Sequence, residues 1–163
     1  MTTLTHTLLG VVLAKISVDT GMIPATSQLI YPFSIIAANA PDFDVLYTPL
    51  ANNHRESLLH TPLFWLVIIG ISYIVGAFYP MILPYIHILT IGVVSHFLLD
   101  TACMRSGIRW FYPFNKKFFN VLHAVTDMHL EDKKIFIKTY MTHPVMLIES
   151  AIVCALIFVY VKL

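Results

Sequence analysis

The amino-acid sequence predicts an all-α integral membrane protein, a bundle of four to five hydrophobic helices with a polar site at one membrane face. The first observation is the composition, since 58% of the 163 residues are hydrophobic and 12% are charged. The mean hydropathy of +0.77 is far above that of an ordinary soluble domain. The second observation is that polar residues of metal-ligand type gather between the apolar runs. We therefore expect one membrane-embedded domain over residues 1–163.

The apolar residues form runs that can enter or cross a bilayer. These runs cover residues 4–18, 22–40, 62–79, 85–101 and 143–163. The first two predict a short helical hairpin, although the first run is barely long enough to cross. The third and fourth predict a second hairpin, because Pro80 and Pro84 cannot continue a helix. The fifth predicts the last transmembrane helix, and its apolar part runs from Pro144 to about Val161.

Two polar segments join these runs. Residues 41–61 are expected to form an extramembrane loop that carries the site. Residues 103–142 are expected to lie at the membrane interface, where Phe118 to Met128 alternate with polar groups at roughly helical spacing. We interpret this part as an interfacial amphipathic helix, with a lid over the site as the functional alternative.

Each predicted hairpin goes out and comes back, so the side on which every polar residue emerges can be followed along the chain. His6 begins the first run, residues 41–60 join the hairpins, His96 and Asp100 end the fourth run, and His143 begins the fifth. All of them fall on one side of the membrane. The sequence therefore predicts a single site.

Asp42 and Asp44 follow Pro41, which helps to end the preceding helix. Their spacing lets two carboxylates reach the same region from turn or extended backbone, where they could bind one or two cations. The alternative is a polar turn whose aspartates cap the next helix.

His54, Arg55 and His60 lie in the loop that enters the third run. Neutral imidazoles are common ligands of zinc and similar ions, and arginine is suited to a bidentate grip on phosphate. The alternative is that these side chains reach the headgroup level without binding a metal.

His96 and Asp100 are spaced i, i+4, so both lie on one face of a helix at the end of an apolar span. Unpaired charge is expensive there, and both side chains should face the protein interior. The alternative is a His–Asp pair that locks two helices, and in a mixed case Asp100 orients His96 without binding the metal.

His6 and Glu149 are the remaining candidates. His6, at the mouth of the first run, could supply another nitrogen ligand or be an ordinary histidine at a helix start. Glu149 lies in the last run, below the site surface, and could act as a general base or ligand. Its alternative is a pairing with threonine, serine or lysine on a neighbouring helix.

Charge predicts which face carries the site. The site side holds most of the basic residues, and Lys15 and Lys162 are on the other side. The site-side residues are Arg55, Arg105, Arg109, Lys116, Lys117, Lys133, Lys134 and Lys138. By the positive-inside rule this face is expected to be cytoplasmic. The net charge of +1 without a basic stripe argues against a nucleic-acid partner.

The polar motifs occur in a fixed order along the chain. They are Thr5-His6, Pro41-Asp42-Phe43-Asp44, His54-Arg55, His60-Thr61, Gly92 with Ser95 to Asp100, Thr101, Gly107 and Tyr112-Pro113. In order, spacing and membrane setting these motifs resemble the YdjM-like family of bacterial inner-membrane, metal-dependent hydrolases, over roughly residues 5–114. The resemblance implies a multi-pass protein of the bacterial inner membrane with a hydrolytic metal site.

Two positions depart from the family pattern. Glu56 to Leu59 separate Arg55 from His60 where many relatives have a shorter spacing, and Val45 stands where a further polar residue is common. We therefore expect a ligand loop of a different shape. No family motif is evident beyond about residue 115.

The expected function is a membrane-bound metal-dependent hydrolase that acts through a metal-activated water on a phosphoester of a lipid or lipid-linked substrate. The expected cofactor is one or two divalent ions, zinc by its share of histidine, with magnesium or manganese as alternatives. Arg55 would hold the anionic substrate group and Glu149 would serve in catalysis. The expected ligands are His6, Asp42, Asp44, His54, His60, His96 and Asp100.

Three alternatives share this sequence pattern. The enzyme could cleave an amide or an ester. The protein could be a membrane transporter or ion-binding protein, but that function needs polar groups spread through the membrane depth, where only His87 and Glu149 interrupt the apolar runs. It could also be a non-enzymatic membrane scaffold that binds a cytoplasmic partner.

Overall fold

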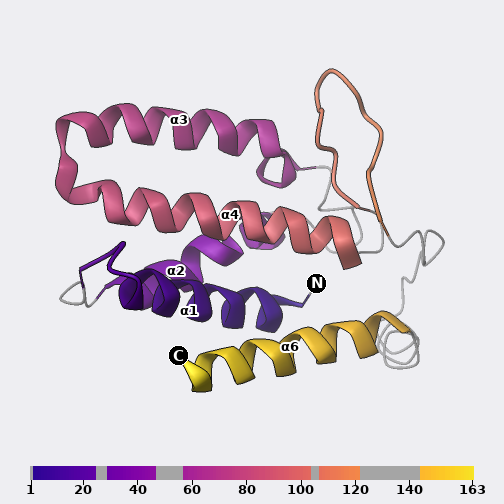
Figure 1. Cartoon of the computed structure of the whole chain (residues 1–163). Coiled ribbons are helices and arrows are strands. Elements are labelled where there is room, and N and C mark those ends of the chain that lie inside the picture. The colour runs from indigo at the N-terminus through magenta and orange to yellow at the C-terminus, as the bar shows by residue number, and fades with distance from the viewer. Residues whose placement is uncertain (1, 25–28, 47–56, 104–106, 122–143) are drawn as a thin grey trace.

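The computed structural model describes residues 2–24, 29–46, 57–103, 107–121 and 144–163 (Figure 1). Helices are the only regular secondary structure within these residues, as the sequence predicts. Two further residues of this part form one isolated β-bridge. The α-helices are α1 (Thr3–Asp19), α2 (Ile30–Asn39), α3 (Pro62–Phe78), α4 (Leu83–Cys103) and α6 (Pro144–Lys162). The 3₁₀ segments are η1 (Ala40–Leu46), η3 (Leu58–His60) and η4 (Pro80–Ile82).

Proline sets several of the helix boundaries. Pro62 is the first residue of α3, Pro80 opens the reversal between α3 and α4, and Pro144 opens α6, which are positions where a missing N–H costs little. The predicted runs 62–79, 85–101 and 143–163 therefore match α3, α4 and α6. The predicted run 22–40 is wrong in extent, because α2 has 10 residues and rises only about 15 Å.

One helix in the described part of the chain is long and apolar enough to cross a membrane. It covers Pro80–Ala102, with 23 residues and a mean hydropathy of 1.8, and Pro62–Phe78 is a shorter apolar helix. The described helices thus do not confirm a bundle of four to five spanning helices. They do turn large apolar side chains outward, including Leu66 and Phe78 on α3 and Leu147 and Val161 on α6. Such a surface needs lipid or protein to cover it.

Several chain segments that are far apart in the sequence come together at one end of the molecule (Figure 1). α3 and α4 form an antiparallel pair joined by η4, and α2 packs against both α1 and α4. The N-terminus of α1 and the C-terminus of α4 lie at the same end, next to η3 (Figure 1). This end carries the polar residues discussed below.

Two glycines let the helices approach closely. A Cβ atom on Gly10 would lie 2.7 Å from the Ser34 carbonyl oxygen, and one on Gly92 would lie 3.0 Å from backbone atoms of Ala37 and Ala38. α1 and α4 therefore touch the backbone of α2, as small residues permit between membrane helices. His6 precedes Gly10 by one turn and His96 follows Gly92 by one turn, so these contacts position both imidazoles.

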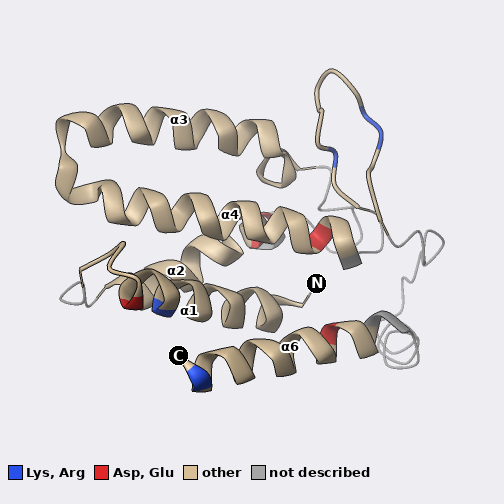
Figure 2. Ribbon diagram, in the orientation of Figure 1, with Lys and Arg blue, Asp and Glu red and all other residues tan. Residues whose placement is uncertain are grey.

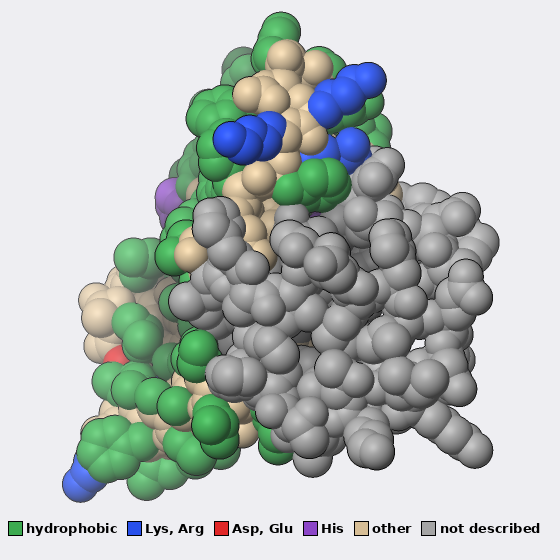
Figure 3. Space-filling model, turned by 90° about the vertical axis from the view of Figure 1, so that its right-hand side faces the viewer, with side chains coloured by type: hydrophobic (Ala, Val, Ile, Leu, Met, Phe, Trp, Pro, Cys, Tyr) green, Lys and Arg blue, Asp and Glu red, His purple; other side chains and the backbone are tan. Residues whose placement is uncertain are grey.

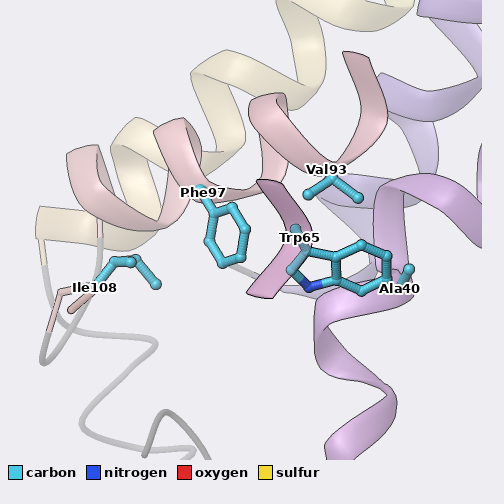
Figure 4. Packing of buried hydrophobic residues seen from close by; sticks show 5 residues of the cluster. All are labelled: Ala40, Trp65, Val93, Phe97 and Ile108. Atoms are coloured by element: carbon cyan, nitrogen blue, oxygen red, sulfur yellow. The ribbon is translucent and has the colours of Figure 1, made fainter. Parts of the chain in front are cut away.

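A cluster of buried apolar side chains packs where several chain segments meet (Figure 4). It joins Ala40, Trp65, Val93, Phe97 and Ile108, from η1, α3, α4 and the segment that follows α4. The Trp65 indole N–H also donates to the Leu59 carbonyl at 2.7 Å. This bond ties η3, and with it His60, to the start of α3.

Residues 107–121, here called the aromatic hairpin, double back on themselves after α4. Ile108 and Phe119 exchange two backbone hydrogen bonds of 3.0 and 2.9 Å. Gly107 has a φ of +73°, and a Cβ there would lie 2.1 Å from the Phe119 carbonyl oxygen. The predicted amphipathic helix is therefore wrong over residues 118–121, which belong to this hairpin, and its remainder lies outside the described residues.

We predict that Gly92→Ala destabilises the protein by about 1–3 kcal/mol, because the added methyl group must push α4 away from α2. The measurement is thermal unfolding of the detergent-purified chain. Gly70→Ala is the matched control, since a Cβ on Gly70 meets nothing within 4 Å, and alanine in a helix should there stabilise by up to about 1 kcal/mol. Equal effects of both substitutions would contradict the close contact.

Candidate metal centre

Six side chains meet at the end of the molecule where α1 begins and α4 ends. His6 comes from α1, Asp42 and Asp44 from η1, His60 from η3, and His96 and Asp100 from α4. We call these residues the His/Asp cluster: His6, Asp42, Asp44, His60, His96 and Asp100. Four separate chain segments thus contribute to one buried site.

The orientation of His96 is set by the backbone of α2. Its Nδ1 atom lies 2.8 Å from the Ala38 carbonyl oxygen. A carbonyl oxygen can only accept a hydrogen bond, so Nδ1 carries the proton and Nε2 of the neutral ring keeps a lone pair. This buried Nε2 has no hydrogen-bond partner in the described part of the chain. It faces Asp42 Oδ1 and Asp100 Oδ2, both at 3.7 Å.

His60 is oriented in the same way, but by a carboxylate. Its Nδ1 lies 2.9 Å from Asp44 Oδ2, and the Ser57 hydroxyl also donates to that oxygen. Ser57 accepts a further bond from the His60 backbone N–H, which holds η3 in place. The carboxylate fixes the tautomer, so the His60 Nε2 lone pair points away from Asp44, as in many metal-binding histidines.

The remaining carboxylates converge on the Nε2 atoms of the two buried imidazoles. His60 Nε2 lies 3.3 Å from Asp42 Oδ1 and 3.9 Å from Asp100 Oδ2. Two ligand atoms of a tetrahedral zinc site, each about 2.0–2.1 Å from the ion, are separated by about 3.3 Å. The separations of 3.3–3.9 Å in the cluster are close to this value, so the donor set fits a small divalent ion.

His6 completes a second group of donors. Its ring stacks on that of His96 with 3.9 Å between centroids, and its Nε2 lies 3.3 Å from Asp100 Oδ1. Two sets of three atoms are therefore close enough to hold an ion, one from Asp42, His60 and His96 and the other from His6, His96 and Asp100. Both sets use His96, at the centre of the cluster.

The cluster is closed except at Asp42. The side chain of Asp42 is 20% exposed, whereas those of His60, His96 and Asp100 are 0–1% exposed. Burial raises the pKa of Asp42, but protonated forms of the neighbouring His60 and His96 rings would lower the pKa more, to about 2. The Asp42 carboxyl is thus ionised at neutral pH and marks the side from which a ligand can enter.

The structure assigns different positions to two predicted ligands. Asp44 lies behind His60 and orients it, so its direct binding to the metal is not what this geometry favours. Asp100 faces the Nε2 atoms of His60 and His96. It does not lie on the Nδ1 side of His96, where a carboxylate that only orients this ring would be expected. His54 and Arg55 lie outside the described residues.

The contacts of Glu149 match the alternative considered for it, a pairing with threonine on a neighbouring helix. Its buried Oε1 accepts hydrogen bonds from the Thr2 backbone N–H and from the hydroxyls of Thr2 and Thr5, all at 2.6 Å. A carboxylate at a helix N-terminus is also favoured by the helix dipole. Glu149 therefore ties α6 to the start of α1, next to His6.

Sequence reasoning missed the groups that orient the ligands. Ser57 was noted only as part of an unusual spacing, although a serine three residues before a histidine is a signal for the cap that it forms on η3. The Ala38 carbonyl leaves no signal in a sequence, because every residue has one. Arg109, buried next to the end of α4, was counted only for topology.

The comparisons with known proteins agree with the membrane setting. A family model described as YdjM inner membrane protein matches residues 1–163, the whole chain. The match extends past residue 115, so the expected limit of the resemblance is corrected. Neither the curated proteins nor the solved structures that were compared gave a match. The chain therefore belongs to the YdjM inner membrane protein family.

Proposed function

We propose that this protein is a membrane-bound, metal-dependent hydrolase of phosphoesters in lipids or lipid-linked substrates. The observation that carries the proposal is the His/Asp cluster itself, in which imidazole lone pairs and carboxylates converge on one buried point. Groups that can only accept hydrogen bonds repel one another at such separations unless a cation or protons lie between them. A structural turn or helix lock would not need this excess of acceptors.

The donor set favours zinc, with magnesium or manganese as alternatives, because imidazole nitrogens suit zinc, whereas magnesium prefers oxygen ligands alone. Asp42, His60 and His96 would supply three ligands, the number that catalytic zinc sites use. Both donor sets include His96, whose one available nitrogen can bind only one ion. A second ion would therefore be held by His6 and Asp100. The bound metal supplies a water of lowered pKa and polarises the group under attack.

The remaining residues of the cluster then have defined tasks. Asp100 lies within 3.7–3.9 Å of the two ligand nitrogens, a position from which a carboxylate can accept a proton from an attacking water. His6 Nε2, 3.3 Å from Asp100 Oδ1, can orient that carboxylate and share the proton. Arg55, which precedes η3 in the chain, is our candidate for the substrate anion.

The place of the cluster along α4 supports a lipid substrate. Asp100 lies two residues from the end of the candidate span Pro80–Ala102, so the cluster would sit at headgroup depth if this helix crosses the bilayer. We propose that the other apolar helices also insert, giving a multi-pass protein. Basic residues that follow α4 favour a cytoplasmic position for the site.

The same placement weighs against the two alternative functions. A transporter needs polar groups through the membrane depth, whereas the cluster is confined to one end of α4. His87, near the other end, is engaged by the Tyr73 hydroxyl at 2.8 Å. A scaffold would not need the cluster, and loss of its ligands would leave such a function unchanged.

The function is tested with the double variant His96→Ala, Asp100→Ala. We expect the purified wild type to carry a stoichiometric divalent metal and to hydrolyse a phospholipid in mixed micelles, with bis(p-nitrophenyl) phosphate as a second substrate. The variant should lose the metal, and its rate should fall about 100-fold or more, since one ligand, the proton acceptor and the activated water are gone. His87→Ala, a histidine of α4 outside the cluster, is the matched control.

Three results would count against this proposal. Wild-type protein without bound metal would remove the zinc form, and activity that survives in the double variant would place the chemistry elsewhere. Hydrolysis of p-nitrophenyl acetate in place of the phosphodiesters would identify an esterase.

The orienting role of Asp44 makes a separate prediction. Asp44→Asn keeps the shape of the side chain but removes the charge that holds the His60 proton, and we expect metal affinity to fall about 10- to 100-fold. Metal affinity is measured by competition with a chromophoric chelator. Asp19→Asn, which changes an exposed carboxylate paired with Lys15 outside the cluster, is the control. Unchanged affinity in Asp44→Asn would show that His60 is not oriented by this carboxylate.

A further inference from the structure

Arg109 is a buried arginine with two guanidinium nitrogens that have no hydrogen-bond partner among the described residues. The residue is 7% exposed, and its Nε and Nη2 atoms have no hydrogen-bond partner in the described part of the chain. Its guanidinium lies over the rings of Tyr112 and Phe118, 4.7 and 5.3 Å from their centroids. Rings on which a guanidinium stacks hold its plane in one orientation but leave its edges available.

The two available atoms form one edge of the guanidinium. Nε–H and Nη2–H point in the same direction, and this is an edge with which arginine makes paired hydrogen bonds to phosphate or carboxylate oxygens. A buried cation without a counter-ion is costly. An anion bound at this edge would offset that cost, so the unpartnered edge points to a ligand.

The surroundings of Arg109 indicate the kind of anion. Lys116 and Lys117 of the same aromatic hairpin are exposed, as are the large side chains of Phe111 (58%) and Phe114 (87%). Figure 2 shows Lys and Arg on both limbs of the hairpin. In Figure 3 basic and hydrophobic side chains lie together at the top of the view. Exposed aromatics next to basic residues are typical of contact with lipid headgroups.

The hairpin is fastened to the end of α4. The Trp110 indole N–H donates to the Thr101 hydroxyl at 2.9 Å, and the Val121 N–H donates to the Thr101 carbonyl at 3.0 Å. Thr101 follows Asp100, and Ile108 packs in the same apolar cluster as Phe97. The basic, aromatic surface therefore belongs to the same end of the molecule as the His/Asp cluster.

We propose that Arg109 binds the phosphate group of an anionic phospholipid headgroup, with Lys116 and Lys117 adding charge and Phe111 and Phe114 entering the interfacial layer. The site goes beyond the proposed hydrolysis, because binding requires no metal and no reaction. It would hold a lipid at the face that carries the His/Asp cluster. Its presence can be tested even in a protein whose metal ligands have been removed.

The test measures lipid binding to the full-length chain in neutral detergent by native mass spectrometry. Dioleoylphosphatidylglycerol is the anionic probe and dioleoylphosphatidylcholine the zwitterionic one. We expect Arg109→Gln to weaken phosphatidylglycerol binding roughly 10-fold or more, since a charge-assisted bidentate contact is lost. Arg109→Lys should recover only part of the affinity, because lysine lacks the paired edge. Lys162→Gln, at the other end of the molecule, is the control.

A second pair of substitutions guards against misfolding of the hairpin. Lys116→Gln with Lys117→Gln changes exposed residues only, and it should weaken phosphatidylglycerol binding roughly 3- to 10-fold with an unchanged melting temperature. The proposal is overturned if both this variant and Arg109→Gln bind phosphatidylglycerol like the wild type, or if Lys162→Gln loses as much affinity as they do.

Inorganic phosphate separates a lipid site from an open phosphate site. Failure of inorganic phosphate at about 10 mM to displace phosphatidylglycerol would support the lipid headgroup. Free phosphate offers the Arg109 edge the same oxygens, and at this ionic strength the Debye length of about 30 Å leaves close contacts little screened. Displacement by phosphate from the wild type but not from Arg109→Gln would retain the phosphate site at Arg109 and overturn its restriction to lipids. Both outcomes are independent of hydrolysis.

Discussion

The hydrogen bond from His96 Nδ1 to the Ala38 carbonyl joins the fold to the chemistry of the site. It can form only because Gly92 lets α4 touch the backbone of α2, and it decides which nitrogen of His96 keeps a lone pair. That lone pair then faces two carboxylates instead of a proton donor. Stacking of His6, convergence of Asp42 and Asp100, and the room for an ion between them all depend on this single orientation.

The rest of the site is held by similar pairs of a ligand and a supporting group. Asp44 and Ser57 hold His60, the Trp65 indole holds η3, and Glu149 holds the start of α1. Most of these supports are buried, where a hydrogen bond is strong and a missing partner is costly. Such a frame keeps ligands in place before an ion arrives, which lowers the ordering cost of binding.

Much of this arrangement could be predicted from the sequence, because the spacing of His96 and Asp100 on one helix face and the alternation of apolar runs carry direct geometric information. The reversal between α3 and α4 and the start of α6 followed from Pro80 and Pro144, whereas Pro84, also expected to break the helix, lies in the first turn of α4. The length of α2 did not, since apolar residues continue through its neighbourhood without forming helix. The roles of Asp44 and Glu149 also needed coordinates, because a carboxylate that binds metal and one that orients a neighbour look alike in a sequence. The second limb of the aromatic hairpin escaped prediction over residues 118–121, because the apolar spacing that begins at Phe118 also fits a helix.

In the proposed centre, the Nε2 atoms of His60 and His96 bind a divalent ion together with carboxylate oxygen. X-ray absorption spectroscopy of the metal in the purified wild-type protein tests it most directly. We expect nitrogen and oxygen neighbours at about 2.0–2.1 Å, with the outer scattering pattern of two or three imidazoles. A protein that binds no divalent metal, or a metal with sulfur neighbours at about 2.3 Å, would contradict it.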